Sequence, residues 1–108
     1  MKQSDIKTQF FDALHAMRKI QVIFFSKEDN KRIVRICAPI DYGPSMRSKD
    51  KSDRYHLWDF TSDVKGHTLS LSPSQIISIE LLPELFTPEE FVTWEPNWIV
   101  KRDWGIYS

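Results

Sequence analysis

The chain has 108 residues, which is a length typical of one domain, and 41% of them are hydrophobic, which argues against global disorder. Lys and Arg together number 15, as do Asp and Glu, so the formal net charge is zero. This balance excludes a globally basic nucleic-acid binder and a polyacidic tail protein, but it leaves room for a local basic patch.

The charge is unevenly distributed along the chain. Residues 1–54 hold twelve basic and seven acidic side chains (12 − 7 = +5), and residues 55–108 hold three basic and eight acidic ones (3 − 8 = −5). The basic half can pack beside the acidic half, or it can leave a basic face for a phosphate-bearing partner. We favour the first interpretation, because most surface charge clusters are simply solvated.

The sequence shows no sign of a membrane segment or of secretion. No apolar run approaches the roughly 18–20 residues of a membrane-spanning helix, and the amino terminus lacks the apolar core of a signal peptide. One cysteine, Cys37, excludes an internal disulfide and a Cys-based zinc site. We therefore expect a cytoplasmic protein with no membrane partner.

The first predicted element is a helix. Ile6, Phe10, Leu14 and Met17 recur at helical spacing and form one apolar stripe. Ser4 is predicted to cap its amino end. Such a stripe must pack against another element to be stable.

Five strands are predicted after the helix. A polar turn at 27–30 makes the first two a hairpin, and Pro39 is expected to end the second. A long mobile loop carrying Arg47, Lys49 and Lys51 is expected at 41–53. The predicted strands span residues 20–26, 31–40, 54–60, 67–72 and 75–82.

A second helix is predicted near the carboxyl end. Thr87 and Glu90 form a capping-box pattern around Pro88, and Phe86 and Phe91 match a hydrophobic staple. Pro96 is expected to end this helix at about residue 95. Three tryptophans are then expected to cover the outer face of the first hairpin, namely Trp94, Trp98 and Trp104.

These elements predict one α+β, mainly β domain over residues 1–108. The expected architecture is a strongly bent antiparallel sheet or a small Sm/SH3-like barrel of about five strands, which would remove sheet edges by closure. An N-terminal helix precedes the sheet, and a short C-terminal helix with an aromatic tail follows it.

The order of these elements resembles the WYL domain, a bacterial module with an Sm-like barrel. The resemblance covers residues 6–82, with 83–108 as a C-terminal extension. It rests on an aromatic first strand, an Arg-x-hydrophobic-x-Pro step, the position of the Trp-Tyr-Leu tripeptide and an Ile-rich last strand. In this sequence these are Phe24-Phe25, Arg35 to Pro39, Tyr55-His56-Leu57 and residues 67–81.

The resemblance implies a non-enzymatic regulatory sensor whose barrel binds a negatively charged ligand, often a nucleotide or single-stranded nucleic acid. Arg35 best matches a ligand contact of such a barrel. It lies in an apolar strand row with Cys37, so it can also be a structural arginine paired with an acidic residue of the tail. The family's arginine in a Phe-Arg-Leu-like step is replaced here by Leu69-Ser70-Leu71.

A second candidate site lies on the third strand. Arg54, His56 and Trp58 alternate onto one face, and a basic and aromatic row suits base stacking combined with phosphate attraction. Packing of Trp58 under the tail is the alternative, and we favour it because aromatic residues in strands mostly serve packing.

Other chemistries have little support in the sequence. His56 and Asp59 alternate onto opposite faces, so a metal site with Asp63 and His67 is disfavoured. Cys37 is expected to be buried and inert, and no phosphate-binding or dinucleotide motif is present. We expect no enzyme activity, no metal and no cofactor.

Two functional hypotheses follow. The first is a WYL-like module in gene regulation that binds a nucleotide or single-stranded nucleic acid through Arg35, Arg54, His56 and Trp58. The second is an adaptor without a small-molecule ligand, which forms a homodimer through the aromatic tail.

Overall fold

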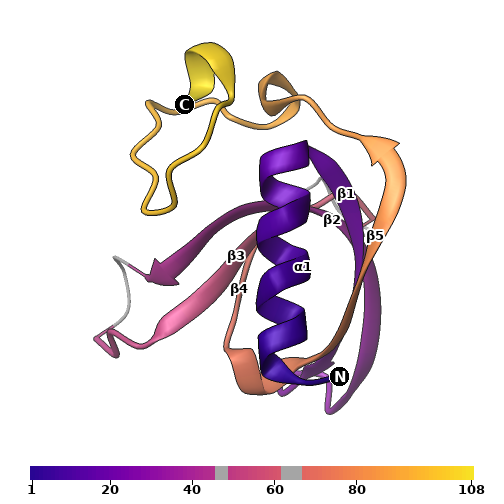
Figure 1. The fold of residues 1–108 in the computed structure, drawn as a ribbon. Coiled ribbons are helices and arrows are strands. Elements are labelled where there is room, and N and C mark those ends of the chain that lie inside the picture. Colours follow the sequence, from indigo (N-terminus) through magenta and orange to yellow (C-terminus); the bar gives the residue numbers. More distant parts are fainter. Residues whose placement is uncertain (46–48, 62–66) are drawn as a thin grey trace.

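The computed structural model describes residues 1–45, 49–61 and 67–108. One helix, α1 (Gln3–Ala16), lies against a single antiparallel sheet, as Figure 1 shows. The strands occur in the order β4-β3-β2-β1-β5 across the sheet. They are β1 (Arg18–Ser26), β2 (Lys31–Pro44), β3 (Asp53–Asp59), β4 (His67–Leu71) and β5 (Ile76–Leu85).

Helix α1 forms where the apolar spacing predicts it and buries that stripe. Ile6, Phe10 and Leu14 are fully buried in the core shared with the sheet. The predicted cap is wrong, because Lys2 and not Ser4 occupies the cap position, and its side chain makes no capping hydrogen bond. At the other end Met17 adopts a left-handed conformation, and its backbone N–H donates a hydrogen bond to the Ala13 carbonyl.

The predicted hairpin of the first two strands is present as β1 and β2. Its register pairs Ile20 with Cys37 and Ser26 with Lys31. Asn30 closes the turn with a φ of 53°, a left-handed conformation that asparagine tolerates better than most residues.

Strand β2 continues beyond its predicted end. Pro39 lies inside it, and the chain remains a strand to Pro44, so the loop predicted from residue 41 begins later. Pairing with β1 stops at Cys37, and the rest of β2 pairs only with β3. Pro39 therefore lies in a half-strand that has one neighbour, where a missing N–H is tolerated. Of the cations expected on the loop, Arg47 lies outside the described residues.

The sheet is bent but does not close into a barrel. In the described part of the chain β4 and β5 remain the two edges and do not pair with each other. Helix α1 contacts β1, β2 and β5 and occupies the concave side of the sheet (Figure 1). The helix thus buries the apolar face that a closed barrel would bury by itself. The bent-sheet alternative describes the fold, and the closed-barrel alternative is wrong.

The predicted C-terminal helix is also wrong, although its local signals form. Only a single 3-10 turn, η2 (Pro88–Glu90), follows β5. The Thr87 N–H donates to the Glu90 carboxylate, and the rings of Phe86 and Phe91 lie 5.7 Å apart, as the capping box and staple predict. Phe91 then leaves helical geometry, and it and the adjacent Val92 are both buried. One face of a helix cannot bury two consecutive side chains equally.

The tail does not cover the outer face of the first hairpin, where Phe25 and Val34 are 38% and 50% exposed. It packs instead at the carboxyl end of α1. There the Trp104 indole N–H donates to the Leu14 carbonyl at 2.9 Å. The last carbonyls of a helix lack partners within the helix, so one of them can accept a hydrogen bond from the buried indole N–H. An apolar hairpin face would leave that N–H without an acceptor.

In the described residues, no helix has the length and apolar content needed to cross a membrane.

Candidate functional site

The strand register separates the four predicted site residues onto two faces. Arg54, His56 and Trp58 alternate on one face of β3, opposite Gly43, Asp41 and Ala38 of β2. Arg35 lies on β2 in the row of Cys37, which pairs with Asp59 on the other face of β3. Arg35 is therefore not brought together with the other three.

Arg35 forms an ion pair with a residue of the sheet. Its Nε lies 3.3 Å from Oδ2 of Asp59, a carboxylate that is 1% exposed. The other oxygen of Asp59 accepts hydrogen bonds from the backbone N–H and the hydroxyl of Thr61. Arg35 thus offsets the charge of a buried carboxylate, and this partner comes from β3 and not from the tail.

The buried Cys37 thiol beside this pair is poorly suited to nucleophilic chemistry. Burial raises the pKa of Cys37, and the negative charge of Asp59 raises it further. A thiol with a raised pKa carries little thiolate at neutral pH. The described residues contain no cluster of three or more side chains placed to bind a metal. Asp63, one of the residues weighed for such a site, lies outside the described ranges.

Trp58 and Arg54 are held in different ways. The Trp58 indole stacks on Phe91, with ring centroids 5.7 Å apart and planes 15° apart, so it packs under the C-terminal segment. The Nε of Arg54 is buried, and no hydrogen-bond partner for it occurs within the described part of the chain. Of this row, His56 is the residue that reaches a pocket.

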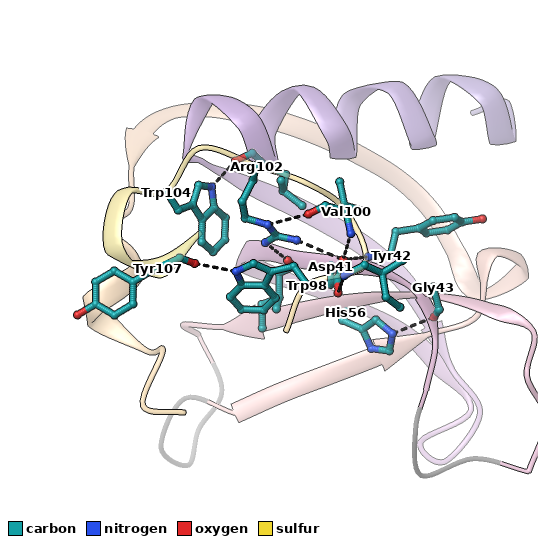
Figure 2. A network of polar contacts seen from close by, with 12 residues as sticks. Asp41, Tyr42, Gly43, His56, Trp98, Val100, Arg102, Trp104 and Tyr107 are labelled. Atoms are coloured by element: carbon teal, nitrogen blue, oxygen red, sulfur yellow. Dashed lines mark hydrogen bonds and ion pairs between the residues drawn. The ribbon is translucent and has the colours of Figure 1, made fainter. Parts of the chain in front are cut away.

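His56 has both ring nitrogens engaged. Nε2 lies 3.0 Å from the carbonyl oxygen of Gly43, as Figure 2 shows. Nδ1 lies 2.8 Å from the hydroxyl of Ser70. A carbonyl can only accept, so Nε2 carries the proton, and neutral His56 accepts from Ser70 through Nδ1. The imidazole is fixed in one orientation, with its edge on β4.

The pocket at His56 lies between the sheet and the tail, and we call it the tail pocket. Its volume is about 610 Å³. Side chains of β2, β3 and β4 form one wall, and the segment 94–99 forms the other. The lining residues are Asp41, Pro44, Ser45, His56, Thr68, Ser70, Trp94, Asn97, Trp98 and Ile99.

A buried polar network holds the tail wall of this pocket against β2. The Asp41 carboxylate accepts hydrogen bonds from the backbone N–H groups of Ile99 and Val100 at 2.8 and 2.9 Å. It also pairs with Arg102 at 3.2 Å, as Figure 2 shows. The indole of Trp98 donates to the Tyr107 carbonyl at 2.7 Å. These contacts fix the backbone on either side of the aromatic wall.

Arg102 is the centre of the network, and its side chain is completely buried although its backbone is partly exposed. Its guanidinium contacts both the Trp98 and the Trp104 ring, at 4.2 and 4.4 Å from their centroids, and the two rings also pack edge to face against each other. It also donates to the carbonyls of Val100 and Ile40. Burial lowers the pKa of Arg102 to about 10, although Asp41 opposes this effect. Arg102 therefore stays protonated at neutral pH, and the aromatic faces stabilise its charge.

Asp41 and Arg102 organise the site, and neither was predicted to belong to it. Asp41 falls in a polar stretch that we predicted to be a loop, and nothing in its spacing indicates a distant partner. The one local signal is an arginine close in sequence to two tryptophans, because such a cluster suits cation–π contacts.

Comparison with known proteins gives one fold-level likeness. No family model matches the sequence, and no curated protein matches it. The solved structure of proteasome accessory factor B/C (PafBC) of Arthrobacter aurescens resembles this chain with a TM-score of 0.62 at 12% identity. The match covers 85% of this chain and 13% of the PafBC chain. PafBC is a transcription regulator with a WYL domain. The likeness therefore supports a WYL-like fold for this chain, and it shows the fold alone.

Proposed function

We propose that this protein is a non-enzymatic regulatory module that binds the base of a nucleotide or of single-stranded nucleic acid in the tail pocket. The observation that carries the proposal is that an aromatic wall and a polar wall face each other across the pocket. Trp94 and Trp98 lie 6.1 Å apart, centroid to centroid, on the tail side. His56 and Ser70 lie on the sheet side.

This arrangement suits a flat ring with polar edges. Indole faces stack on nucleobases, and the hydroxyls of Thr68 and Ser70 offer donors and acceptors to a base edge. Trp94 is 43% exposed, which is unfavourable for a large apolar side chain and leaves its face open to a ligand. Among the described residues no Lys or Arg lines the pocket, and we propose that a phosphate attached to the base remains outside it.

We propose a basic rim at the mouth of the pocket. Pro44 and Ser45 line the pocket, and the exposed Lys49 and Lys51 lie a few positions later in the sequence. We propose that Arg54, next to His56 on its face of β3, also belongs to this basic rim. The fold likeness to a transcription regulator supports a regulatory role.

Tryptophan fluorescence provides the test. Adenosine, adenosine monophosphate and a short single-stranded oligonucleotide are titrated at two salt concentrations. We expect saturable changes with all three. Binding of the oligonucleotide should weaken with salt while binding of the nucleoside does not, because the nucleoside carries no phosphate. Trp94→Ala and Ser70→Ala should each weaken binding at least tenfold.

Phe25→Ala is the matched control, because Phe25 is an exposed aromatic residue on β1 outside the pocket. It should leave binding unchanged. Absence of a saturable change with all three compounds, or equal binding by Trp94→Ala and the parent, would count against the proposal.

The alternative is a homodimeric adaptor, and exposed apolar side chains on the tail support it. Trp98 and Trp104 pack within the chain, so a dimer contact would use other tail residues, above all Ile106, which is 90% exposed. Native mass spectrometry reports the subunit number and any carried ligand together. A dimer that Ile106→Glu converts to a monomer would favour the adaptor.

A further inference from the structure

A second pocket lies on the opposite side of β3, beside the amino end of α1, and we call it the helix pocket. Its volume is about 500 Å³. Most of its accessible lining is apolar, but polar groups of α1, β2, β3 and the turn before β5 border it. The lining residues are Gln3, Ser4, Lys7, Tyr42, Tyr55, Pro73 and Ser74.

Tyr55 lines this pocket, and its hydroxyl has no hydrogen-bond partner among the described residues. Its side chain is 1% exposed, and its ring packs against Phe10 and Tyr42 with centroids 4.9 and 4.8 Å apart. A buried tyrosine normally finds a partner for its hydroxyl, so this donor is available to a ligand.

Lys7 is exposed and brings a positive charge to the pocket. Its ammonium lies 4.8 Å from the centroid of the Tyr42 ring and 5.8 Å from that of Phe11. It forms no ion pair with any carboxylate of the described ranges. The two rings hold the ammonium at the pocket without neutralising it.

The helix adds backbone donors at the same place. The N–H groups of Asp5 and Ile6 bond to the Lys2 carbonyl, but Lys2 provides no side-chain cap. The N–H groups of Gln3 and Ser4 precede these and have no acceptor within the helix. Gln3 is anchored by its side-chain amide to the Pro73 carbonyl at 3.1 Å, which fixes this end of α1. The positive end of the helix dipole reinforces the charge of Lys7.

We propose that the helix pocket binds a small oxyanion, a phosphate or carboxylate group, through the ammonium of Lys7, the hydroxyl of Tyr55 and the open N–H groups of α1. Burial raises the pKa of Tyr42 and the negative charge of Asp53 raises it further, so the positive groups of the site must outweigh a nearby carboxylate. The site is independent of the tail pocket, because Tyr55 and His56 alternate onto opposite faces of β3.

Amide chemical shifts of the full chain provide the test. Inorganic phosphate and acetate are titrated against a chloride reference of equal ionic strength. We expect saturable shifts at Gln3 and Ser4, and the stronger of the two anions identifies the preferred group. Lys7→Gln and Tyr55→Phe should each weaken binding at least fivefold. Tyr55→Phe keeps the buried ring, so the fold is retained.

Lys31→Gln, which removes an exposed lysine at the start of β2, is the matched control and should bind like the parent. Shifts that do not saturate with either anion, or equal affinity in the parent, Lys7→Gln and Tyr55→Phe, would overturn the proposal. Because adenosine carries no anionic group, its binding in the tail pocket is tested separately, and failure of one site does not imply failure of the other.

Discussion

Asp41 and Arg102 lie 61 positions apart in the chain, and their side chains meet at 3.2 Å beneath the aromatic tail. The carboxylate belongs to β2, and the guanidinium belongs to a segment with no regular secondary structure at that point. The tail is therefore attached to the sheet by this ion pair and not by strand pairing. The position of the tail wall of the pocket depends on the pair.

The two halves of this pair should differ in their contribution to stability. Asp41→Ala leaves Arg102 buried without a counterion, and we expect a loss of about 3–5 kcal/mol in the free energy of unfolding. Arg102→Met should cost less, because three backbone N–H groups still donate to Asp41, those of Tyr42, Ile99 and Val100. Urea denaturation measures both.

The double variant and a surface pair complete this test. Asp41→Ala combined with Arg102→Met should cost less than the sum of the single changes, because no buried charge is left alone. Glu84→Ala, which breaks the exposed pair with Lys19, should cost at most about 1 kcal/mol. Additive single effects would show that the two side chains act independently.

Gly43 lies directly under the tail and should not tolerate a side chain. A Cβ there would lie 2.5 Å from Cδ1 of Ile99, and the φ of Gly43 is +150°. That conformation is nearly restricted to glycine, so Gly43→Ala should destabilise the fold by about 2–3 kcal/mol. Thermal denaturation measures the change.

Gly105→Ala provides a comparison in which only the backbone conformation, and not contact with a neighbouring side chain, opposes the substitution. Gly105 has a φ of +62°, but a Cβ there would meet nothing within 4 Å. This left-handed conformation alone costs about 1–2 kcal/mol. Gly43→Ala should therefore be the more damaging of the two, and Ile99→Ala should relieve part of its cost. An equal cost for the two glycines would mean that contact with the tail is unimportant.

The sequence predicted elements whose signals are local. The helical stripe from Ile6 to Leu14, the hairpin around Asn30 and the contact of Phe86 with Phe91 each depend on residues close in the chain, and each is present. The continuation of β2 past Pro39 was not predicted. It is possible because only β3, and not β1, pairs with this part of β2, and such pairing between distant segments is not visible in the local sequence.

The candidate site was less predictable than the fold. His56 was selected from the alternation of β3, and it does line the tail pocket. The position of the wall formed by Trp94 and Trp98 depends on the ion pair between Arg102 of the tail and Asp41 of β2. These two residues are far apart in the sequence. A strand pattern carries no information about such a distant ion pair, so the pocket itself could not be predicted.

The capping box at Thr87 should stabilise the turn before the tail although no helix follows. Glu90 accepts from both the backbone N–H and the hydroxyl of Thr87. Glu90→Ala should cost about 1 kcal/mol, because the N–H loses its partner. Glu89→Ala, at the exposed neighbouring position, should change stability by less than half as much. Chemical denaturation of the two variants compares them, and an equal effect would exclude a specific role for Glu90.

Alkaline pH should destabilise the fold partly through Tyr55. Burial raises the pKa of Tyr55 to about 12 from an ordinary value of 10. Between these two values the unfolded chain releases the phenolic proton while the folded chain retains it. The stabilisation is therefore complete below pH 10 and is lost as the pH rises to about 12, with a loss of about 2 kcal/mol.

Tyr55→Phe removes this titration while keeping the aromatic ring. Its free energy of unfolding should fall less steeply than that of the parent between pH 10 and pH 12, measured by urea denaturation at each pH. Burial also raises the pKa of Cys37, which both proteins contain, so the difference between their curves isolates Tyr55. Parallel curves would show that the Tyr55 hydroxyl ionises as readily in the folded chain as in the unfolded one.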